Sequence, residues 1–360
     1  MRVAVLGAGG IIAPAIVRDL AESEEVTHLK LLDLDEARAR ATGEAHAPGA
    51  EVRRVDPDGG LGYMLSGVDV LVNSASYRVN LDAMRACLEA GCHYIDLGGL
   101  YHLTTRQLEL DDDFTTVGKL ALLGMGSSPG KTNVMGVRAV EELGATPELM
   151  DVYAAGRDLD PPDGPSYPYA PRTLVDELTE PPMALRDGEP TALDPMQDGG
   201  SYPFPEPIGE GSSIYTLHSE VRTFGDSFGC ADCSFRLSLA PAVLERVKSL
   251  VGAEEEAIAA AAAEAVPSSG KTVSVHVVTA RSNGRLVTVT AKTQGMEDWG
   301  IGGGIVSTAA PAAAAVRLLA RGAVDAVGAM PPERCVRPED LFPELERRNC
   351  TFNVETTEAT

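Results

Sequence analysis

The sequence has few basic residues, and this limits the partners that we expect. Only 30 of the 360 residues are Lys or Arg, against 53 Asp and Glu, so the formal net charge is −23. Nucleic acids and anionic membranes are bound through basic patches, and we therefore expect neither as a partner. The acidic surface fits either an ordinary solvated surface or adaptation to high salt, and composition does not separate the two.

Long apolar runs are also missing from the sequence. No apolar stretch reaches the length of about 20 residues that a membrane-spanning helix needs. The apolar start of the chain superficially resembles a signal peptide, but Gly7, Gly9 and Pro14 interrupt it, as a strand, turn and helix would. We therefore expect a cytoplasmic protein.

Cysteine is too scarce to build a disulfide framework, with six residues in the chain. Cys230 and Cys233 have C-x-x-C spacing. A structural zinc ion needs four ligands, and no second pair follows nearby. We expect no metal site and interpret the two cysteines as ordinary residues of a strand or turn.

The first part of the chain alternates short apolar runs with amphipathic segments. Strands are expected at residues 2–6, 27–35, 51–55, 67–75, 93–97 and 120–126. Helices are expected at residues 11–21, 35–43, 81–91 with Gly91 as C-cap, and near 104–118. Alternating strands and helices with short links predict an α/β fold with a doubly wound parallel sheet over residues 1–128, a Rossmann domain.

The pattern changes after residue 128. Residues 158–210 are rich in Pro, Gly and Asp and are expected to be rich in loops. Segments that alternate with period two predict an antiparallel or mixed sheet, at 220–224, 233–239, 272–280 and 285–293. Further helices are expected at roughly 241–265 and at 308–321, the latter capped by Ser307 or Thr308.

The stretch VLGAGGIIAPAI, residues 5–16, is nearly a dinucleotide-binding fingerprint. In G-x-G-x-x-G, the first glycine makes the tight turn and the second lets the backbone approach a pyrophosphate. Gly7 and Gly9 take these two places, and Gly10 and Ile11 follow. Ile12 stands where the third glycine is usual, and that position mainly sets how closely strand and helix pack. We therefore expect a shifted helix rather than a lost site.

Asp33 provides the second half of the fingerprint. It ends the second expected strand, at close to the usual spacing after Gly7. A carboxylate there accepts hydrogen bonds from the ribose hydroxyls and repels a 2′-phosphate, which favours NAD over NADP. Arg38 lies close enough in sequence to leave NADP possible, and a solvent-exposed turn residue is the alternative role for Asp33.

Four stretches together resemble the saccharopine dehydrogenase-like family. They are GAGGIIAPAI (7–16), the segment 72–99 that ends in DLGG, GMGSSPGKTNVMG (124–136) and the PPE segment 331–349. Within the family, the short length and DLGG look most like the L-lysine 6-dehydrogenases.

The resemblance implies a bilobal, homodimeric enzyme that binds NAD(P). The Rossmann domain, 1–128, would be completed by a C-terminal helix within 305–330. A second α/β domain on a mixed sheet, 129–304, would hold the substrate and mediate dimerisation, and 331–360 would form a C-terminal segment. The small-molecule substrate would be an amino acid or amine, oxidised at a carbon that bears nitrogen to give an imine that water hydrolyses.

Candidate site residues follow from this reaction and from the strand ends. We expect Asp96, His218, Tyr77 and Lys131 to handle protons. For the cofactor we expect Gly7, Gly9, Gly10, Ile11, Ile12, Asp33, Ser74, Ala75 and Gly98. For the substrate we expect Ser128, Pro129, Asn133, Glu220 and Arg222. His218, Glu220 and Arg222 alternate, and on a strand they would share one face.

Each candidate also has a structural alternative. His218 could be a partly buried histidine whose hydrogen bonds are satisfied, Arg222 could belong to an ion pair, and Tyr77 could belong to the core. Two other functions remain open. One is reductive C–N bond formation, as in a saccharopine reductase or a carboxynorspermidine- or homospermidine-type synthase. The other is a non-catalytic sensor that binds a dinucleotide.

Overall fold

The computed structural model describes residues 1–56 and 59–358, and the chain divides into two compact units. Unit 1 consists of Met1–Val134 and Thr308–Leu345, and unit 2 of Met135–Ser307 and Glu346–Thr360. The first division falls after Val134 rather than after residue 128. The C-terminal segment predicted at 331–360 is split between the units, and its last two residues lie outside the described ones.

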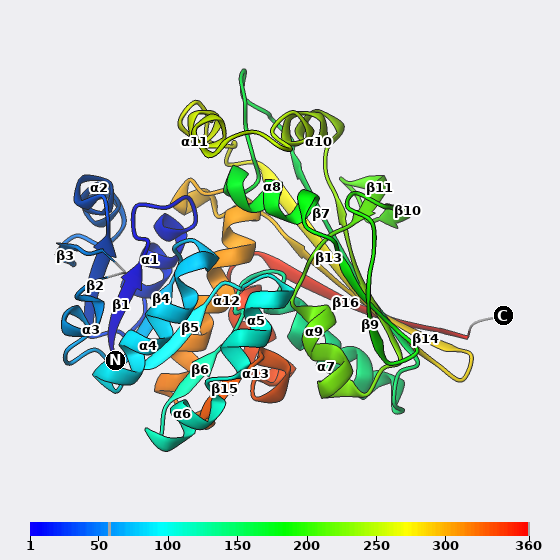
Figure 1. Ribbon diagram of the computed structural model, residues 1–360, viewed down its shortest axis with the longest axis horizontal. Helices are drawn as coiled ribbons and strands as arrows, with labels where there is room; N and C mark the ends of the chain where they lie inside the picture. The colour runs from blue at the N-terminus through cyan, green and yellow to red at the C-terminus, as the bar shows by residue number, and fades with distance from the viewer. Residues whose placement is uncertain (57–58, 359–360) are drawn as a thin grey trace. The chain divides into compact units, whose positions relative to one another are not determined.

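Unit 1 is built on a seven-stranded sheet with the order β15-β6-β5-β4-β1-β2-β3 (Figure 1). Its strands are Arg2–Leu6 (β1), His28–Asp33 (β2), Glu51–Arg54 (β3), Val70–Asn73 (β4), His93–Asp96 (β5), Leu120–Leu122 (β6) and Gly328–Met330 (β15). Every neighbouring pair is parallel. The order 3-2-1-4-5-6 is that of a dinucleotide-binding sheet, so the predicted doubly wound fold is confirmed.

Helices connect these strands. They are Ala13–Ala21 (α1), Glu36–His46 (α2), Leu61–Met64 (α3), Asn80–Ala90 (α4), Tyr101–Leu108 (α5), Asp111–Thr116 (α6) and Pro338–Glu346 (α13), with short 3₁₀ turns at Tyr77–Val79 and Pro332–Arg334. Pro14 stands in the first turn of α1, where its missing N–H costs nothing. Gly91 caps α4 in the left-handed conformation, as predicted, with φ at 68°. The single helix predicted near 104–118 is two helices, α5 and α6.

The core of unit 1 follows from strands that are apolar on both faces. In β1 only Arg2 is exposed, and Val3 to Leu6 are buried. Between the sheet and its helices lies an apolar cluster that includes Leu6, Leu71, Tyr94 and Phe114. Parallel strands covered on both sides read as continuous apolar runs, which is why the sequence located them well.

Unit 2 is built on a nine-stranded mixed sheet with the path β10-β11-β12-β7-β13-β14-β16, and β8 and β9 pair beside β12. Its strands are Leu149–Asp158 (β7), Met183–Arg186 (β8), Glu189–Ala192 (β9), Asp198–Phe204 (β10), Gly209–Tyr215 (β11), Asp232–Ser238 (β12), Thr272–Ser282 (β13), Arg285–Thr293 (β14) and Cys350–Glu358 (β16). β12 and β7 are parallel, whereas β13 is antiparallel to β7 and β14. The predicted second α/β domain on a mixed sheet is therefore confirmed. The C-terminal strand β16, red in Figure 1, runs beside β14.

The helices of unit 2 are Pro171–Thr179 (α8), Glu220–Phe228 (α9), Pro241–Lys248 (α10) and Glu255–Ala263 (α11). The prediction of a strand at 220–224 is wrong, because these residues form α9. Its buried residues are Glu220, Val221, Thr223 and Phe224, the spacing of a helix face rather than of a strand. The helix predicted over 241–265 is interrupted between α10 and α11, where Gly252 has a φ of 76°. The region 158–210, predicted to be rich in loops, contains α8, β8, β9 and β10.

Three helices have residues in both units: Lys131–Leu143 (α7), Gly303–Ala320 (α12) and α13, whose last residue Glu346 is assigned to unit 2. The helix predicted at 308–321 thus begins earlier, and Ser307 and Thr308 lie inside it instead of capping it. Among the described residues, α12 is the one helix long and apolar enough to cross a membrane, and 72% of that stretch is buried within the protein.

Candidate functional site

The glycine-rich loop after β1 makes a tight turn at the carboxyl end of the sheet. The N–H groups of Gly7 and Ala8 donate to the carbonyl of Leu32, and the N–H of Gly10 donates to the carbonyl of Gly7 over 2.9 Å. Gly7 has a φ of +77°, and a Cβ there would stand 2.5 Å from the backbone nitrogen of Ala75. Only glycine fits at Gly7, as the fingerprint requires.

Asp33 holds this loop from the end of β2. One carboxylate oxygen accepts the N–H of Gly9 over 2.8 Å, and the other accepts the N–H of Asp35, also over 2.8 Å. A Cβ on Gly9 would lie 2.7 Å from the Cβ of Arg38. The acid predicted for the ribose therefore lies directly beside the second glycine, with exposed Arg38 close by.

The N-terminus of α1 follows this loop without a side-chain cap. Its N-cap residue is Ile12, which accepts no hydrogen bond through its side chain, and the preceding Ile11 is 45% exposed. The first N–H groups of a helix lack partners within the helix and favour an anion. Together with the side-chain-free turn at Gly7 and Gly9, this donor set fits the pyrophosphate of a dinucleotide.

The loop after β4 lies against the same turn. The hydroxyl of Ser74 donates to the carbonyl of Leu6 over 2.9 Å, and the N–H of Ala75 donates to the side chain of Asn73 over 3.1 Å. Tyr77 begins the short 3₁₀ turn that follows and is half-buried, with the guanidinium of Arg78 over its ring at 5.8 Å. Ser74 and Ala75 therefore border the nucleotide loop where the sequence placed them.

Asp96, at the end of β5, is the centre of a buried polar network. One oxygen accepts the N–H groups of Gly98 and Gly124 over 2.9 and 2.6 Å. The other accepts the side chains of Gln107 over 2.6 Å, Tyr94 over 3.0 Å and Asn80 over 3.1 Å. Burial raises the pKa of Asp96 above its usual value, although the hydrogen bonds from Gln107, Gly124, Tyr94 and Gly98 oppose this shift.

The sequence predicted that the side chain of Asp96 faces the crevice. In the structure this side chain is buried within the polar network. The residue is 1% exposed, and five donors surround its carboxylate. It holds two loops together, one after β5 and one after β6. Sequence reasoning missed Asn80 and Gln107, because a buried Asn or Gln within a helix gives no spacing signal of its own.

The turn after β6 packs closely on the loop after β5. The ring of Pro129 would meet a Cβ on Gly98 or on Gly124 at 2.7 Å, so both glycines make room for it. Asn133 stabilises this turn by accepting the N–H of Gly130 over 2.7 Å and donating to Glu333 over 2.7 Å. Asn133 is thus engaged in the turn itself, and Glu333 of the PPE segment was not among the predicted residues.

Lys131 and Ser128 belong to the same turn. Lys131 begins α7 and is 1% exposed, and its N–H donates to the carbonyl of Gly126 over 2.9 Å. Ser128 is half-buried and precedes Pro129. Gly98, Ser128, Pro129, Lys131 and Asn133 thus lie together at the carboxyl ends of β5 and β6, the edge at which a doubly wound sheet binds its ligands.

His218 and Glu220 lie in unit 2, in a second polar cluster. The ring of His218 stacks on Phe235 at 3.5 Å between centroids. Its Nδ1 lies 3.6 Å from Glu220, and its Nε2 lies 3.9 Å from Glu177. The hydroxyl of Tyr169 donates to the other oxygen of Glu177 over 2.5 Å. Tyr169 and Glu177 come from the loop-rich region and were not predicted.

Electrostatics in this cluster favour a protonated histidine. Burial lowers the pKa of His218, but the neighbouring carboxylates of Glu220 and Glu177 raise it to above its usual value. Burial also raises the pKa of Glu177. His218 and Glu220 therefore do meet, but at the start of a helix and not on a strand face.

The side chain of Arg222 does not join His218 and Glu220. It lies on α9 and forms an ion pair with Asp226 one turn later, with 2.5 Å between nitrogen and oxygen. The prediction that Arg222 shares a strand face with His218 and Glu220 is wrong for the same reason as the strand itself. Within residues 1–56 and 59–358, no group of three or more His, Cys, Asp or Glu is arranged to hold a metal ion.

Comparison with known proteins finds a family whose model matches part of the first unit. Residues 3–122 match the family described as the saccharopine dehydrogenase NADP-binding domain. A curated relative, carboxyaminopropylagmatine dehydrogenase from Synechocystis, is 25% identical over 241 residues. That match covers 62% of this chain and 58% of the relative, so the chain spans little more than half of the relative's length.

A solved structure extends the similarity of fold to nearly the whole chain. Saccharopine dehydrogenase (L-Glu forming) from Saccharomyces cerevisiae superimposes with a TM-score of 0.73 at 14% identity, covering 99% of both chains. Residues 3–122 therefore resemble the NADP-binding domain of the saccharopine dehydrogenases, on a chain that shares the fold of the yeast enzyme.

Proposed function

From a Rossmann domain of the saccharopine dehydrogenase type, we propose that this protein is an NAD(P)-dependent dehydrogenase acting on a C–N bond of an amino acid. The observation that carries the proposal is the edge of the unit 1 sheet. There the Gly7–Gly9 turn and Asp33 lie on one side, and the loops held by Asp96 lie on the other. A nucleotide and a small substrate would meet along this edge.

The bound NAD(P) would accept a hydride from the carbon that carries nitrogen. The C–H and N–H bonds become a C=N bond, and the proton goes to a base or to water. Water then adds to the imine and releases an amine or ammonia. This chemistry needs a proton acceptor and groups that hold the substrate's charges.

We assign the proton transfers to residues at that edge and in the second cluster. Tyr77 and Lys131 are the candidates in unit 1, and His218 with Glu220 in unit 2. Asp96 acts as a positioning residue, because its two oxygens are occupied by five donors. Ser128, Pro129 and Asn133 shape the turn on which the substrate would lie.

For the substrate we propose the side-chain amine of L-lysine, by oxidative deamination. The DLGG segment supports this choice. A second candidate is supported by the Synechocystis relative, whose name describes a carboxyaminopropyl group joined to agmatine. In that case the enzyme would make or break a secondary amine, and the reductive direction would need two substrates, an aldehyde and an amine.

One assay distinguishes these cases. NAD(P)⁺ reduction is followed with L-lysine, L-saccharopine and diamines, and NAD(P)H oxidation with an aldehyde plus an amine. Ammonia release from lysine supports deamination, and turnover that requires two substrates supports reductive C–N bond formation. Cofactor binding with no turnover on any of them supports the sensor and contradicts the enzyme.

We also propose a cytoplasmic homodimer that prefers NAD. The preference follows from Asp33, which would repel a 2′-phosphate. Asp33→Ser should shift the affinity ratio toward NADPH, measured by fluorescence titration with both reduced cofactors. Light scattering of the eluting protein tests the dimer, and a monomer across the concentration range would contradict it.

A further inference from the structure

A groove of about 350 Å³ lies on one face of the unit 2 sheet. Its volume falls within the range of roughly 300–1,000 Å³ that is typical of small-molecule sites. Strands β13, β14 and β16, which lie side by side in Figure 1, supply its floor, and the end of β10 with the loop after it supplies a wall. No residue of the groove belongs to the proposed dehydrogenase site, so it needs an explanation of its own.

The register of the sheet arranges the side chains of the floor in rows. In the middle row, Val277 of β13 pairs with Thr290 of β14, and Thr290 pairs with Asn353 of β16. Residues that pair across neighbouring strands share a face of the sheet, and so do residues two apart along a strand. The middle of the floor therefore consists of a buried valine, a hydroxyl group and an amide.

Charges of opposite sign stand at the two ends of this floor. Lys292 pairs with Thr351 in one outer row, and Thr288 pairs with Glu355 in the other. Thr351 and Glu355 are four residues apart on β16, which corresponds to ~14 Å between their Cα atoms in an antiparallel strand. The groove thus presents a cation at one end and an anion at the other.

Neither charge is cancelled by an ion pair within the part of the chain that the structure describes. The Nζ of Lys292 donates to the carbonyl of Glu206 over 3.5 Å, which uses one of its three donors. One oxygen of Glu355 accepts the side-chain amide of Asn353 over 2.8 Å. Both charges can therefore still pair with charges of a ligand.

The wall of the groove is aromatic and apolar. The ring of Tyr202 stacks on that of Tyr153, the neighbour of the middle row on β7, with 4.2 Å between the centroids. Pro203 and Pro205 continue the wall. Burial and the charge of Glu355 raise the pKa of Tyr202, which agrees with a carboxylate that faces this wall. Such a wall suits a chain of methylene groups.

We propose that this groove binds a linear amino acid with a terminal ammonium group, of the type of 6-aminohexanoate. The carboxylate of the ligand pairs with Lys292, and its ammonium group pairs with Glu355. The methylene groups between them lie along Val277, Tyr202 and the prolines. A diamine or a dicarboxylate would bring a like charge to one end of the groove, so the arrangement selects a ligand with both charges.

Calorimetric titration of the intact protein without cofactor tests this selection. The three ligands are 6-aminohexanoate, hexylamine, which lacks the carboxylate, and hexanoate, which lacks the ammonium group. We expect 6-aminohexanoate to bind at least about tenfold more tightly than either of the others. Because no cofactor is present, this result does not depend on whether the protein is a dehydrogenase.

Two variants assign the ends of the ligand. Lys292→Met should weaken binding of 6-aminohexanoate by about tenfold and leave the affinity for hexylamine unchanged. Glu355→Gln should weaken binding of 6-aminohexanoate by about the same factor and leave the affinity for hexanoate unchanged. Lys271→Met is the control, because Lys271 pairs with Asp160 outside the groove, and it should change none of these affinities.

Three results would overturn the proposal. The first is no binding of 6-aminohexanoate, or equal affinities for the three ligands. The second is binding that Lys292→Met and Glu355→Gln leave unchanged. The third is a dimer in light scattering that either variant converts to a monomer, because a second copy of the chain would then occupy the groove. Thermal melts of the variants confirm that they are folded when titrated.

Discussion

At the scale of single residues, the nucleotide loop depends on positions where no side chain fits. Gly9 donates to Asp33 and lies against Arg38. The fingerprint spacing predicted both glycines and the acid, because the reasons for them are local. Ile12 was predicted to be tolerated, and it lies at the N-cap of α1, ahead of the first helical turn.

Gly9→Ala should therefore weaken cofactor binding more than it weakens the fold. A Cβ at 2.7 Å from the Arg38 Cβ forces the loop or α2 to move away from the bound phosphate. We expect the Kd for NADH to rise by about tenfold or more, which corresponds to about 1.4 kcal/mol. Gly304→Ala, where the nearest contact is an ordinary 3.7 Å, is the control. Equal affinities in both variants would show that Gly9 lies away from the nucleotide.

The role of Asp96 could not be predicted from its position in the sequence alone. Its predicted place at the end of a strand is confirmed, because Asp96 ends β5, whereas its part in the site stays a prediction. Its five donors come from other segments, and a strand pattern contains no information about them.

Asp96→Asn should be destabilising, because the amide nitrogen would face hydrogen-bond donors on whichever side it turns. We expect a loss of about 2–4 kcal/mol in the free energy of unfolding, measured by urea denaturation. If Asp96 positions the loops, kcat should fall while its pH profile keeps its shape. A shifted pH profile in a stable variant would instead show that Asp96 transfers the proton.

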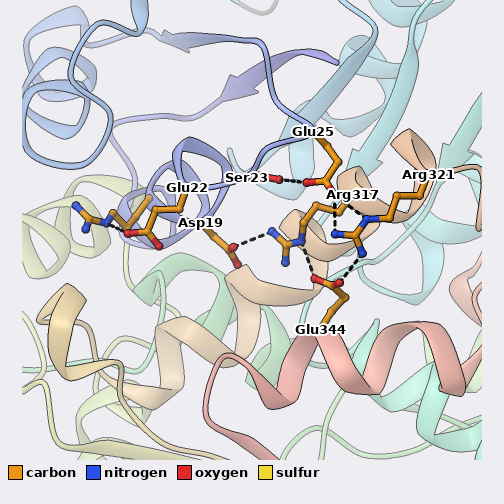
Figure 2. Close-up of polar contacts among 8 residues, drawn as sticks. Asp19, Glu22, Ser23, Glu25, Arg317, Arg321 and Glu344 are labelled. Carbon is orange, nitrogen blue, oxygen red and sulfur yellow. Dashed lines mark hydrogen bonds and ion pairs between the residues drawn. The ribbon is translucent and has the colours of Figure 1, made fainter.

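At the scale of elements, a buried ion network joins α1 to α12 and α13 within unit 1 (Figure 2). Arg317 of α12, 3% exposed, bonds Asp19 of α1 over 2.8 Å and Glu344 of α13 over 2.7 Å. Arg321 bonds the same Glu344 over 2.7 Å and Glu25 over 2.6 Å. The nucleotide-binding helix is thereby held to the returning C-terminal chain.

Arg317→Met should leave two buried carboxylates without their shared cation. We expect the free energy of unfolding to fall by about 3–5 kcal/mol. Arg18→Met, which removes a single exposed i,i+4 pair with Glu22, should cost about 1 kcal/mol or less. Urea denaturation of both variants tests this. Similar losses would mean that the network contributes no more than a surface pair.

Element α9 shows where sequence patterns fail. The sequence EVRTF, residues 220–224, is compatible with the two-residue period of a strand and with a helix. A segment this short does not distinguish the two periods. Glu220 is fully buried beside His218. Glu177, which approaches the same histidine, and Tyr169, which donates to Glu177, come from the region predicted to be rich in loops. The cluster was therefore predicted in part only.

The cluster around His218 should make stability depend on pH. The folded-state pKa of His218 lies above its unfolded value, so the stabilisation is fully present below about pH 6.5 and is lost as the pH rises through the folded value. Glu177, with its raised pKa, acts in the same direction, while Glu220, Tyr169 and Asp176 complete the titratable surroundings.

The difference in unfolding free energy between the wild type and His218→Gln should therefore shrink as the pH rises from about 6.5 through the folded-state pKa of His218. His93→Gln is the control, because burial lowers the pKa of His93 and gives the opposite slope. Parallel slopes for the two variants would contradict the assignment of His218 as the charged histidine.

At the scale of the whole molecule, composition predicted the class of protein, and alternation of elements predicted two α/β units. Both predictions rest on many residues at once, so single exceptions such as α9 leave them intact. The limits of the units were less predictable, because α7 and α12 each have residues in both, and no glycine or proline marks such a limit inside a helix. Substrate identity depends on side chains from irregular segments. The patterns of a single sequence predict the positions of such side chains least well.

The central claim is that this chain couples NAD(P) to a C–N bond, and one measurement tests it most directly. Purified protein is mixed with NAD⁺ or NADP⁺ and each of a panel of amino acids, secondary-amine amino acids and diamines, and absorbance of the reduced cofactor is followed. The account predicts reduction that depends on an amine substrate and that Gly9→Ala diminishes. Tight binding of NADH without turnover on any amine, in either direction, would contradict it.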